Sequence, residues 1–213
     1  MRLDKIIWRA VWKTLLAAAA LIAAMLLLLI SLFPHTLMDF TDSLGMDKLS
    51  VKFAVTSYER FEKIDYIANG ARVALRANLY DEADECIELL IADDGFQAYC
   101  DAKDAETGAL LPGEGYRNYY YRQLCLAKYL SGEKTGAVDR AVQLTAQSFS
   151  VGNPLISVIA QARADGDDGR ATMVYVYEKM TVVRAGVYEN YSVQDQAEFD
   201  RVYATVTAWT QTA

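Results

Sequence analysis

The sequence predicts an all-α protein in which one N-terminal transmembrane helix is followed by antiparallel helical hairpins. Two observations predict this fold class. Residues 14–33 form an apolar run without a charge. Beyond it, apolar residues recur at steps of three and four, the period of a helix that buries one face, and turn-forming residues separate the periodic segments. The expected parts are a short cytoplasmic tail (1–13), a transmembrane anchor (14–33), a juxtamembrane segment (34–46) and an α-helical extracytoplasmic domain (47–213).

The uncharged run is long enough to cross a membrane as a helix. Its 20 residues would extend about 30 Å, the thickness of the hydrocarbon core of a bilayer. A cleaved secretory signal has a shorter apolar stretch, about 7–15 residues, followed by a cleavage site of small residues. Residues 31–36 offer no such site. We therefore expect an uncleaved anchor that contacts membrane lipid through residues 14–33.

Charge sets the expected orientation of the chain. Four basic residues precede the anchor, and the first charged residues after it are acidic. The positive-inside rule then places the N-terminus in the cytoplasm and the domain outside it, as a single-pass protein of the cell membrane. Residues 34–213 carry 17 Lys and Arg against 27 Asp and Glu, so we expect no nucleic-acid partner.

The anchor also carries small residues at a spacing that permits close contact between helices in an oligomer. They are Ala19, Ala20, Ala23 and Ala24. Because alanine is common in anchors, the same residues also fit an anchor that makes no such contact.

The juxtamembrane segment follows Pro34, which ends or bends the anchor helix. Leu37, Phe40 and Leu44 then recur at helical spacing, and Gly45 closes the stretch. The apolar face that they form is expected either to lie among lipid headgroups or to pack on the domain. The sequence does not distinguish these two placements.

The domain begins with two predicted helices. Asp47 is the expected N-cap of one long helix over 48–77, in which apolar residues keep to steps of three and four. Asn78 and Leu79 then make a tight connection. A second helix with a single apolar face follows, and it ends before Gly95.

The middle of the domain is less uniform. Residues 95–115 show weaker periodicity and end in the turn-forming residues 111–115. After this segment, the pattern predicts a helix over 116–130 and a partner helix over 137–149.

Asn153 and Pro154 open the next hairpin, whose second helix is predicted to run through 172–188. These residues are rich in β-branched and aromatic side chains, which is also typical of strands, but the helical stepping continues through them and favours a helix. A last helix follows Ser192 and Asp195, which have the spacing of a capping box.

Three of the predicted turns share a spacing. Asn78, Gly132 and Gly166 are each followed five residues later by an alanine: Ala83, Ala137 and Ala171. A turn needs a residue that tolerates a left-handed backbone, and the helix after it needs a small side chain where it crosses its neighbour. In this respect the chain resembles the tetratricopeptide repeat, a helix–turn–helix unit of about 34 residues. The resemblance implies a solenoid that binds a partner in a groove between stacked hairpins; the alternative is a helical bundle.

The residues that carry most enzyme chemistry are scarce. The one histidine, His35, is expected beside the membrane, so no histidine base is available in the domain. No motif for a nucleophile, a phosphate loop or a metal is present, and we predict no catalytic residue, cofactor or metal site. Cys86 and Cys100 either form a disulfide outside the cytoplasm or, like Cys125, pack as small apolar side chains.

Tyrosine is abundant, with 14 residues, and it clusters at the start of the helix predicted over 116–130. Tyrosine offers a large contact area with little loss of side-chain entropy, which favours it at binding surfaces. Tyr120 follows the apolar stripe and is expected in the core. The candidate partner-binding residues are Tyr116, Arg117, Tyr119, Tyr121 and Arg122.

Together these features predict a membrane-anchored extracytoplasmic helical-repeat protein that mediates protein–protein interaction or assembly at the cell envelope, with a protein or peptide as its partner. Two alternatives stay open at this point. One is an envelope glycan hydrolase that uses carboxylates alone. The other is a ligand-sensing domain coupled through the anchor.

Overall fold

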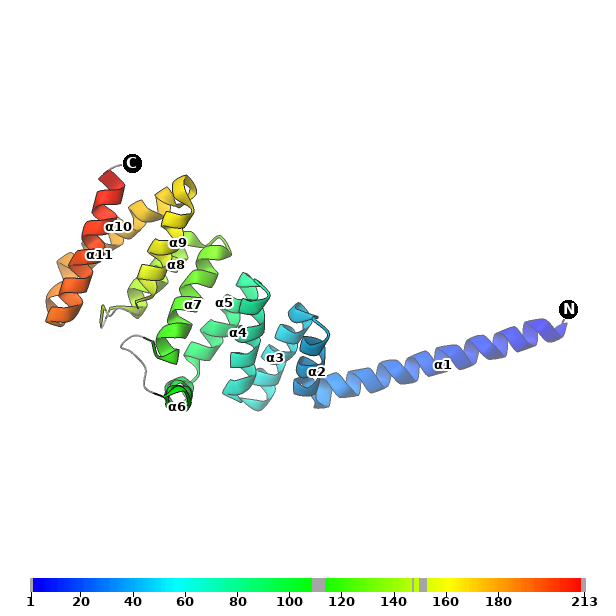
Figure 1. Ribbon diagram of the computed structural model, residues 1–213. Helices are drawn as coiled ribbons and strands as arrows, with labels where there is room; N and C mark the ends of the chain where they lie inside the picture. The colour runs from blue at the N-terminus through cyan, green and yellow to red at the C-terminus, as the bar shows by residue number, and fades with distance from the viewer. Residues whose placement is uncertain (1, 109–113, 147, 150–152, 212–213) are drawn as a thin grey trace.

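The computed structural model describes residues 2–108, 114–146, 148–149 and 153–211 (Figure 1). In these ranges the chain forms α-helices and two short 3₁₀ turns, with no strand, so the predicted all-α class is confirmed. The helices are α1 (Arg2–Leu32), α2 (Pro34–Ser43), α3 (Asp47–Phe61), α4 (Ile64–Arg76), α5 (Tyr80–Ala92), α6 (Phe96–Thr107), α7 (Tyr116–Leu130), α8 (Lys134–Leu144), α9 (Pro154–Ala164), α10 (Arg170–Gly186) and α11 (Val193–Gln211).

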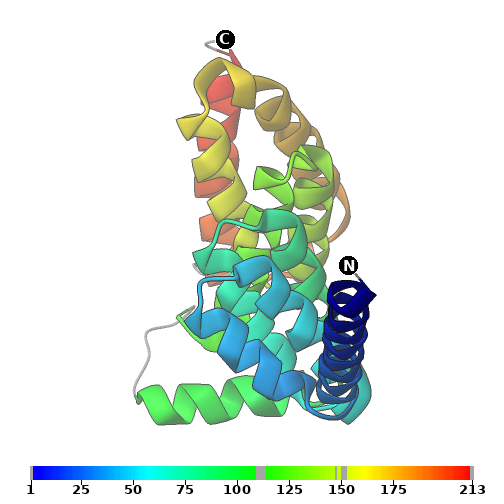
Figure 2. The ribbon, with the colours of Figure 1, turned by 90° about the vertical axis from the view of Figure 1, so that its right-hand side faces the viewer.

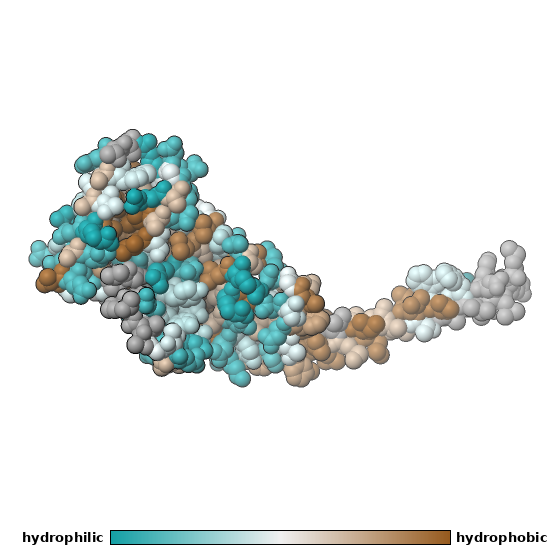
Figure 3. All heavy atoms as spheres, viewed as in Figure 1, coloured by the Kyte–Doolittle hydropathy of each residue, from teal (hydrophilic) through white to brown (hydrophobic). Residues whose placement is uncertain are grey.

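The helix α1 projects away from the rest of the molecule. Residues 11–32 of it are long and apolar enough to cross a membrane. The described side chains of α1 are exposed, and Figure 3 shows them as an apolar rod beside a body whose surface is largely hydrophilic. An apolar surface of this extent is unfavourable in water.

The remaining helices form a body in which each helix packs against neighbours in the chain (Figures 1 and 2). The helix α2 packs against α3, α3 against α4, and α4 against α5. The helix α5 then packs against α7, and α7 packs against both α8 and α9. The body has two apolar cores, and α7 contributes to both: Leu124 and Ala127 lie in the first, and Cys125 and Tyr129 in the second. Figure 2 shows α6 leaving this arrangement and crossing its lower end.

Small side chains let the first helices of the body approach closely. A Cβ atom at Gly70 on α4 would lie 2.8 Å from the Ala54 Cβ on α3 and 3.3 Å from the Cys86 Sγ on α5. The three cysteines are buried and free, so Cys86 and Cys100 form no disulfide here. Burial raises the pKa of the Cys86 thiol to about 12, which keeps it neutral and unreactive.

The prediction of one long helix over 48–77 is wrong. The chain instead forms α3 and α4, which pack against each other. Glu62 adopts a left-handed backbone with φ 52°, its N–H donates to the Tyr58 carbonyl, and Lys63 is extended. The reversal needs only these two residues, so the apolar spacing continues across it and hides it from periodicity.

Two further boundaries differ from the predicted ones. The segment 95–115, which has weak periodicity, contains the regular helix α6, and its buried residues are Phe96 and Cys100. Most of the predicted turn at 111–115 lies outside the described residues. The helix α8 ends at Leu144 rather than near 149. Phe149 lies beyond the helix end, buried with its ring centroid 5.1 Å from that of Phe199.

The predicted N-cap at Asp47 is wrong: Asp47 is the first residue of α3, and the N-cap is Met46, which makes no side-chain capping hydrogen bond. The other predicted turns and the capping box fit the sequence. Asn78, Gly132 and Gly166 all have positive φ angles, 56°, 104° and 60°. The segment 172–188 is helical through α10 up to Gly186. The side chain of Ser192 accepts a hydrogen bond from the Asp195 N–H at 3.1 Å, as a capping box requires.

The third small residue of the turn pattern is an exception. Ala83 and Ala137 are fully buried, but Ala171 is exposed. The close approach in this hairpin falls two residues earlier, at Gly169, where a Cβ atom would lie 1.8 Å from the Ala162 carbonyl oxygen. The predicted role of Ala171 is therefore wrong, and Gly169 takes it.

Candidate functional site

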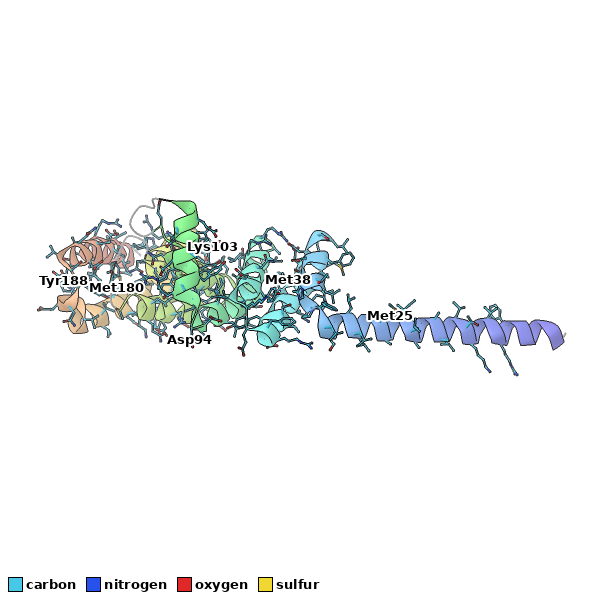
Figure 4. The ribbon with its side chains drawn as sticks, turned by 90° about the horizontal axis from the view of Figure 1, so that it is seen from below. Met25, Met38, Asp94, Lys103, Met180 and Tyr188 are labelled. Atoms are coloured by element: carbon cyan, nitrogen blue, oxygen red, sulfur yellow. The ribbon has the colours of Figure 1, made fainter. Side chains whose placement is uncertain are left out.

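The body contains a groove with a volume of about 750 Å³ between α4 on one side and α6 and α7 on the other. Met38 and Asp39 of α2 close the end of it nearest α1. Figure 4 shows the arrangement from below, with α6 carrying Lys103 across the body and Met38 on the side of α1. The groove lies where α6 leaves the row of helices, and α4, α6 and α7 all contribute to its lining.

Tyrosines of α7 form one wall of the groove. The ring of Tyr119 lies 5.3 Å from that of Tyr120 and 6.3 Å from that of Tyr116, centroid to centroid. Tyr120 is buried, as predicted, whereas Tyr119 is 39% exposed. Among the residues that the structure describes, the hydroxyls of Tyr116 and Tyr119 have no hydrogen-bond partner, so both can bind a ligand group.

The start of this wall is fixed by a contact from α6. The carboxylate of Asp104 accepts a hydrogen bond of 2.7 Å from the backbone N–H of Tyr116, which satisfies one of the free N–H groups at the start of α7. The contact needs a glycine beside it, since a Cβ atom at Gly115 would lie 2.8 Å from the same carboxylate. This hydrogen bond thus joins the start of α7 to α6.

The helix α6 adds an aromatic ring and a cation. The ammonium of Lys103 lies 6.0 Å from the centre of the Tyr99 ring and 2.9 Å from the carboxylate of Glu106. The ring of Tyr99 lies 6.4 Å from that of Tyr120, which joins α6 to the wall formed by α7.

The opposite wall is the exposed side of α4. The guanidinium of Arg72 donates to the side-chain oxygen of Asn69 and lies 3.5 Å from Asp42 on α2. The ring of Tyr66 stacks on His35 at 5.7 Å with an angle of 22° between the planes. These contacts hold both side chains at the edge of the groove next to α2.

The groove presents both signs of charge and neutral hydroxyls. Its lining carries four carboxylates and three cations; the acids are Asp39, Asp65, Glu106 and Glu114, and the bases are Arg72, Lys103 and Arg122. Burial raises the pKa of Tyr99, Tyr119 and Tyr120, so these phenols stay protonated and act as hydrogen-bond donors at neutral pH. In the described part of the chain, no group of three His, Cys, Asp or Glu side chains could hold a metal ion.

The structure separates the five candidate residues into two sets. Tyr116, Tyr119 and Arg122 line the groove. Arg117 and Tyr121 do not: Arg117 is exposed and donates to Gln97 at 3.3 Å, and the Tyr121 ring packs against Phe96 at 6.0 Å.

Sequence reasoning missed the residues that face the tyrosines. The missed lining residues with rings or charges include Tyr66, Arg72, Tyr99 and Lys103. The spacing of Tyr99 and Lys103, four residues apart, is a signal that the two share a face of one helix. Nothing in the sequence signals that α4 lies opposite α7.

Comparison of the chain with protein-family models, with curated proteins and with solved structures finds no match.

Proposed function

We propose that the chain is a membrane-anchored protein whose helical body lies outside the cytoplasm and binds a protein or peptide partner in the groove between α4 and α7. In this role the protein is a subunit for interaction or assembly at the cell envelope. It needs no catalytic group for this work.

The observation that carries the proposal is the composition of the groove. Tyr116 and Tyr119 offer ring faces and free hydroxyls, and three cations and four carboxylates line the same groove. A polypeptide supplies the matching groups along its length: apolar side chains for the rings, backbone N–H and C=O for the hydroxyls, and charged side chains for Arg72 and Arg122. A lining of this polarity suits an extended polar partner better than a small apolar ligand.

A recurring tyrosine–aspartate hydrogen bond supports a tetratricopeptide-like arrangement of hairpins. The hydroxyl of Tyr58 on α3 donates to Asp93 after α5 at 2.7 Å, and that of Tyr129 on α7 donates to Asp165 after α9 at 2.8 Å. The two partners are 35 residues apart in the first pair and 36 in the second. This separation is close to one tetratricopeptide repeat, about 34 residues, and stacked repeats commonly present a binding groove.

The anchor is proposed from α1. Residues 11–32 have the length and hydropathy of a membrane span, and basic residues precede them. In this orientation the positive-inside rule places the body, and with it the groove, outside the cytoplasm.

Photo-crosslinking tests the proposed binding in the full chain. A benzoylphenylalanine placed at Tyr119 should, on illumination of cells that express the protein, form an adduct with one polypeptide partner. The substitution Arg122→Glu, made in the same chain, should remove the adduct, because it reverses one charge of the groove without disturbing a hydrogen bond of the fold.

The matched control is a benzoylphenylalanine at Val182 on α10, a side chain that is 68% exposed and lies outside the groove. It should not form the adduct. An equal yield from Val182, or an adduct at Tyr119 that survives Arg122→Glu, contradicts binding in the groove.

A further inference from the structure

The helix α2 keeps an apolar face that the body does not cover. Phe33, Phe40 and Leu44 recur at helical spacing and are 51%, 57% and 58% exposed. The sequence predicted this face at Leu37, Phe40 and Leu44, either among lipid headgroups or packed on the domain. Leu37 is half-buried, but the body leaves Phe40 and Leu44 uncovered.

The body takes the other side of α2. Pro34, Met38 and Thr41 are buried on this side, where α2 packs against α3, and Met38 also contacts Asn69 of α4. The hydroxyl of Ser50 on α3 donates to the Met38 carbonyl at 3.0 Å, which fixes the rotation of α2 about its own axis. With that rotation fixed, Phe40 and Leu44 cannot turn inward without breaking the packing of Met38.

Exposed apolar side chains continue from α2 onto α3. Met46, Leu49 and Phe61 are also exposed, and the ring of His35 links Phe61, at 5.8 Å, with Phe33, at 6.3 Å. We call the set Phe33, Phe40, Leu44, Met46, Leu49 and Phe61 the α2–α3 patch. Figure 3 shows apolar spheres at the end of the body that adjoins the apolar rod of α1.

We propose that the α2–α3 patch is a lipid-binding surface that lies in the headgroup region of the bilayer crossed by α1. The inference rests on the proposed function, since it requires α1 to be a membrane anchor. Phe33 alone separates α1 from α2, and α2 runs across the axis of α1 (Figures 1 and 2). When α1 crosses the bilayer, α2 therefore lies along its surface, in the position of an interfacial amphipathic helix.

The charge of this region favours apolar insertion over electrostatic attraction. Residues 34–63 carry five acidic and four basic side chains. A surface with no excess of positive charge gains little from anionic lipid. We therefore expect the patch to enter a zwitterionic bilayer as well as an anionic one, with its apolar side chains about 5–10 Å deep.

This placement has a consequence for the groove. Met38 and Asp39 of the same helix line the groove on its side toward α1. The patch therefore fixes the groove close to the membrane surface and limits rotation of the body about the anchor, so that a partner held in the same membrane meets it in one orientation.

Fluorescence quenching of the full chain in phosphatidylcholine vesicles tests the inference. Single cysteines replace Phe40 or Leu44 and are labelled with an environment-sensitive dye; the native cysteines are at most 1% exposed and stay unlabelled. A nitroxide on the lipid acyl chain should quench both labels, and aqueous iodide should not. Added phosphatidylserine should leave the result unchanged.

Three control positions make each outcome decisive. Asp39→Cys, at an exposed position of α2 that lines the groove and not the patch, and Val193→Cys, which is 85% exposed on α11, should be quenched by iodide and not by the nitroxide. Met25→Cys in α1 should be quenched by the nitroxide. If Met25 responds in this way while Phe40 and Leu44 respond like Val193, the anchor stands and the lipid surface is refuted.

Two other results also overturn the inference. Labels at Phe40 and Leu44 that resist both quenchers mean that protein, such as a second copy of the chain, covers the patch. A label at Met25 that the nitroxide does not reach means that α1 is not in the bilayer, and then the anchor of the proposed function fails as well.

Discussion

The two cores of the body solve the same packing problem in different ways. In the first, small residues such as Gly70, Ala71 and Ala83 lie where α3, α4 and α5 approach one another. In the second, large side chains such as Phe199 and Met173 fill the space between α8, α9, α10 and α11. Both cores also enclose aromatic side chains: Phe96 and Tyr120 are buried in the first, and Phe149 and Phe199 in the second.

Tyrosine hydroxyls are used differently in the two regions, apart from that of Tyr58 in the first region, which donates to Asp93. In the second region the hydroxyls of Tyr129 and Tyr175 donate to Asp165 and Asp139, so they are used by the fold. In the first region Tyr116 and Tyr119 face the groove without such a partner in the part of the chain that the structure describes. The comparison separates tyrosines whose hydroxyls stabilise the fold from two whose hydroxyls are available to a ligand.

The largest effect is expected from removing volume in the second core. Phe199→Ala leaves a cavity among Phe149, Tyr188 and Tyr191 and should lower the free energy of unfolding by about 3–5 kcal/mol. Thermal unfolding of the full chain in detergent micelles, followed by circular dichroism, measures the loss. Phe40→Ala is the control, because the Phe40 ring is exposed and its removal should change the free energy of unfolding little. Equal losses for the two variants would mean that the second region has no tightly packed core.

The first core should fail when volume is added. Gly70→Val places methyl groups against Ala54 and Cys86, and such overpacking costs about 1–3 kcal/mol. The control is Gly186→Ala on α10, where nothing lies within 4 Å of the new Cβ atom, so that variant should be neutral or slightly more stable. The same unfolding assay compares the two, and a tolerated valine at position 70 would show that α3, α4 and α5 are not closely packed.

A half-buried ion-pair network joins the two regions. Lys128 on α7 lies 2.8 Å from Asp84 on α5, and Arg140 on α8 lies 2.7 Å from Glu88. Burial raises the pKa of Asp84 above its ordinary value even with Lys128 beside it. The folded state thus binds the Asp84 proton more tightly than the unfolded state does, and this contribution to stability is present at low pH and lost as the pH rises through the folded pKa.

Lys128→Met should therefore lower the free energy of unfolding most at neutral pH, where Asp84 is charged and loses its partner. The expected loss there is about 1–2 kcal/mol. The difference in the free energy of unfolding between the variant and the native chain should become smaller as the pH falls toward the raised pKa of Asp84. Urea unfolding at several pH values measures it. The control is Lys179→Met, which breaks a more exposed pair with Asp139 and should cost about 0.5 kcal/mol. A penalty for Lys128→Met that grows in acid would contradict this assignment.

The smallest changes in stability are expected from removing single tyrosine hydroxyls. Tyr129→Phe removes the hydrogen bond to Asp165 and should cost about 0.5–1.5 kcal/mol. Tyr119→Phe removes a hydroxyl that the fold does not use and should change stability by less than about 0.5 kcal/mol, while weakening capture of the partner in the groove. A larger loss of stability at Tyr119 than at Tyr129 would reverse the comparison between the two regions.

Much of the local structure could be predicted because it depends on local chemistry. Asn78, Gly132 and Gly166 mark their turns since each must hold a left-handed backbone. Asn153 accepts the N–H of Leu155 as a helix cap, a contact between near neighbours in the chain. The break at Glu62 was not predictable, because a non-glycine residue takes the left-handed conformation there and apolar spacing carries on past it.

The candidate site could be predicted only in part, for the same reason. Four tyrosines of α7 lie within residues 116–121, and this local cluster can be recognised in the sequence. Their counterpart Arg72 lies on another helix, 44 or more residues away, and only tertiary packing brings it to the groove. Arg117 and Tyr121 share the local composition but point elsewhere, because a helix turns about 100° per residue and a run of neighbours cannot all face one side.

The side of the membrane that carries the body is the central claim. Val193 is exposed on the body, and Arg9 is exposed and precedes residues 11–32 of α1. Each is replaced by cysteine in the full-length chain, and the variants are treated with a membrane-impermeant maleimide in spheroplasts, before and after permeabilisation. We predict that position 193 reacts in intact spheroplasts and position 9 reacts only after permeabilisation. The reverse pattern would place the body in the cytoplasm and contradict the account.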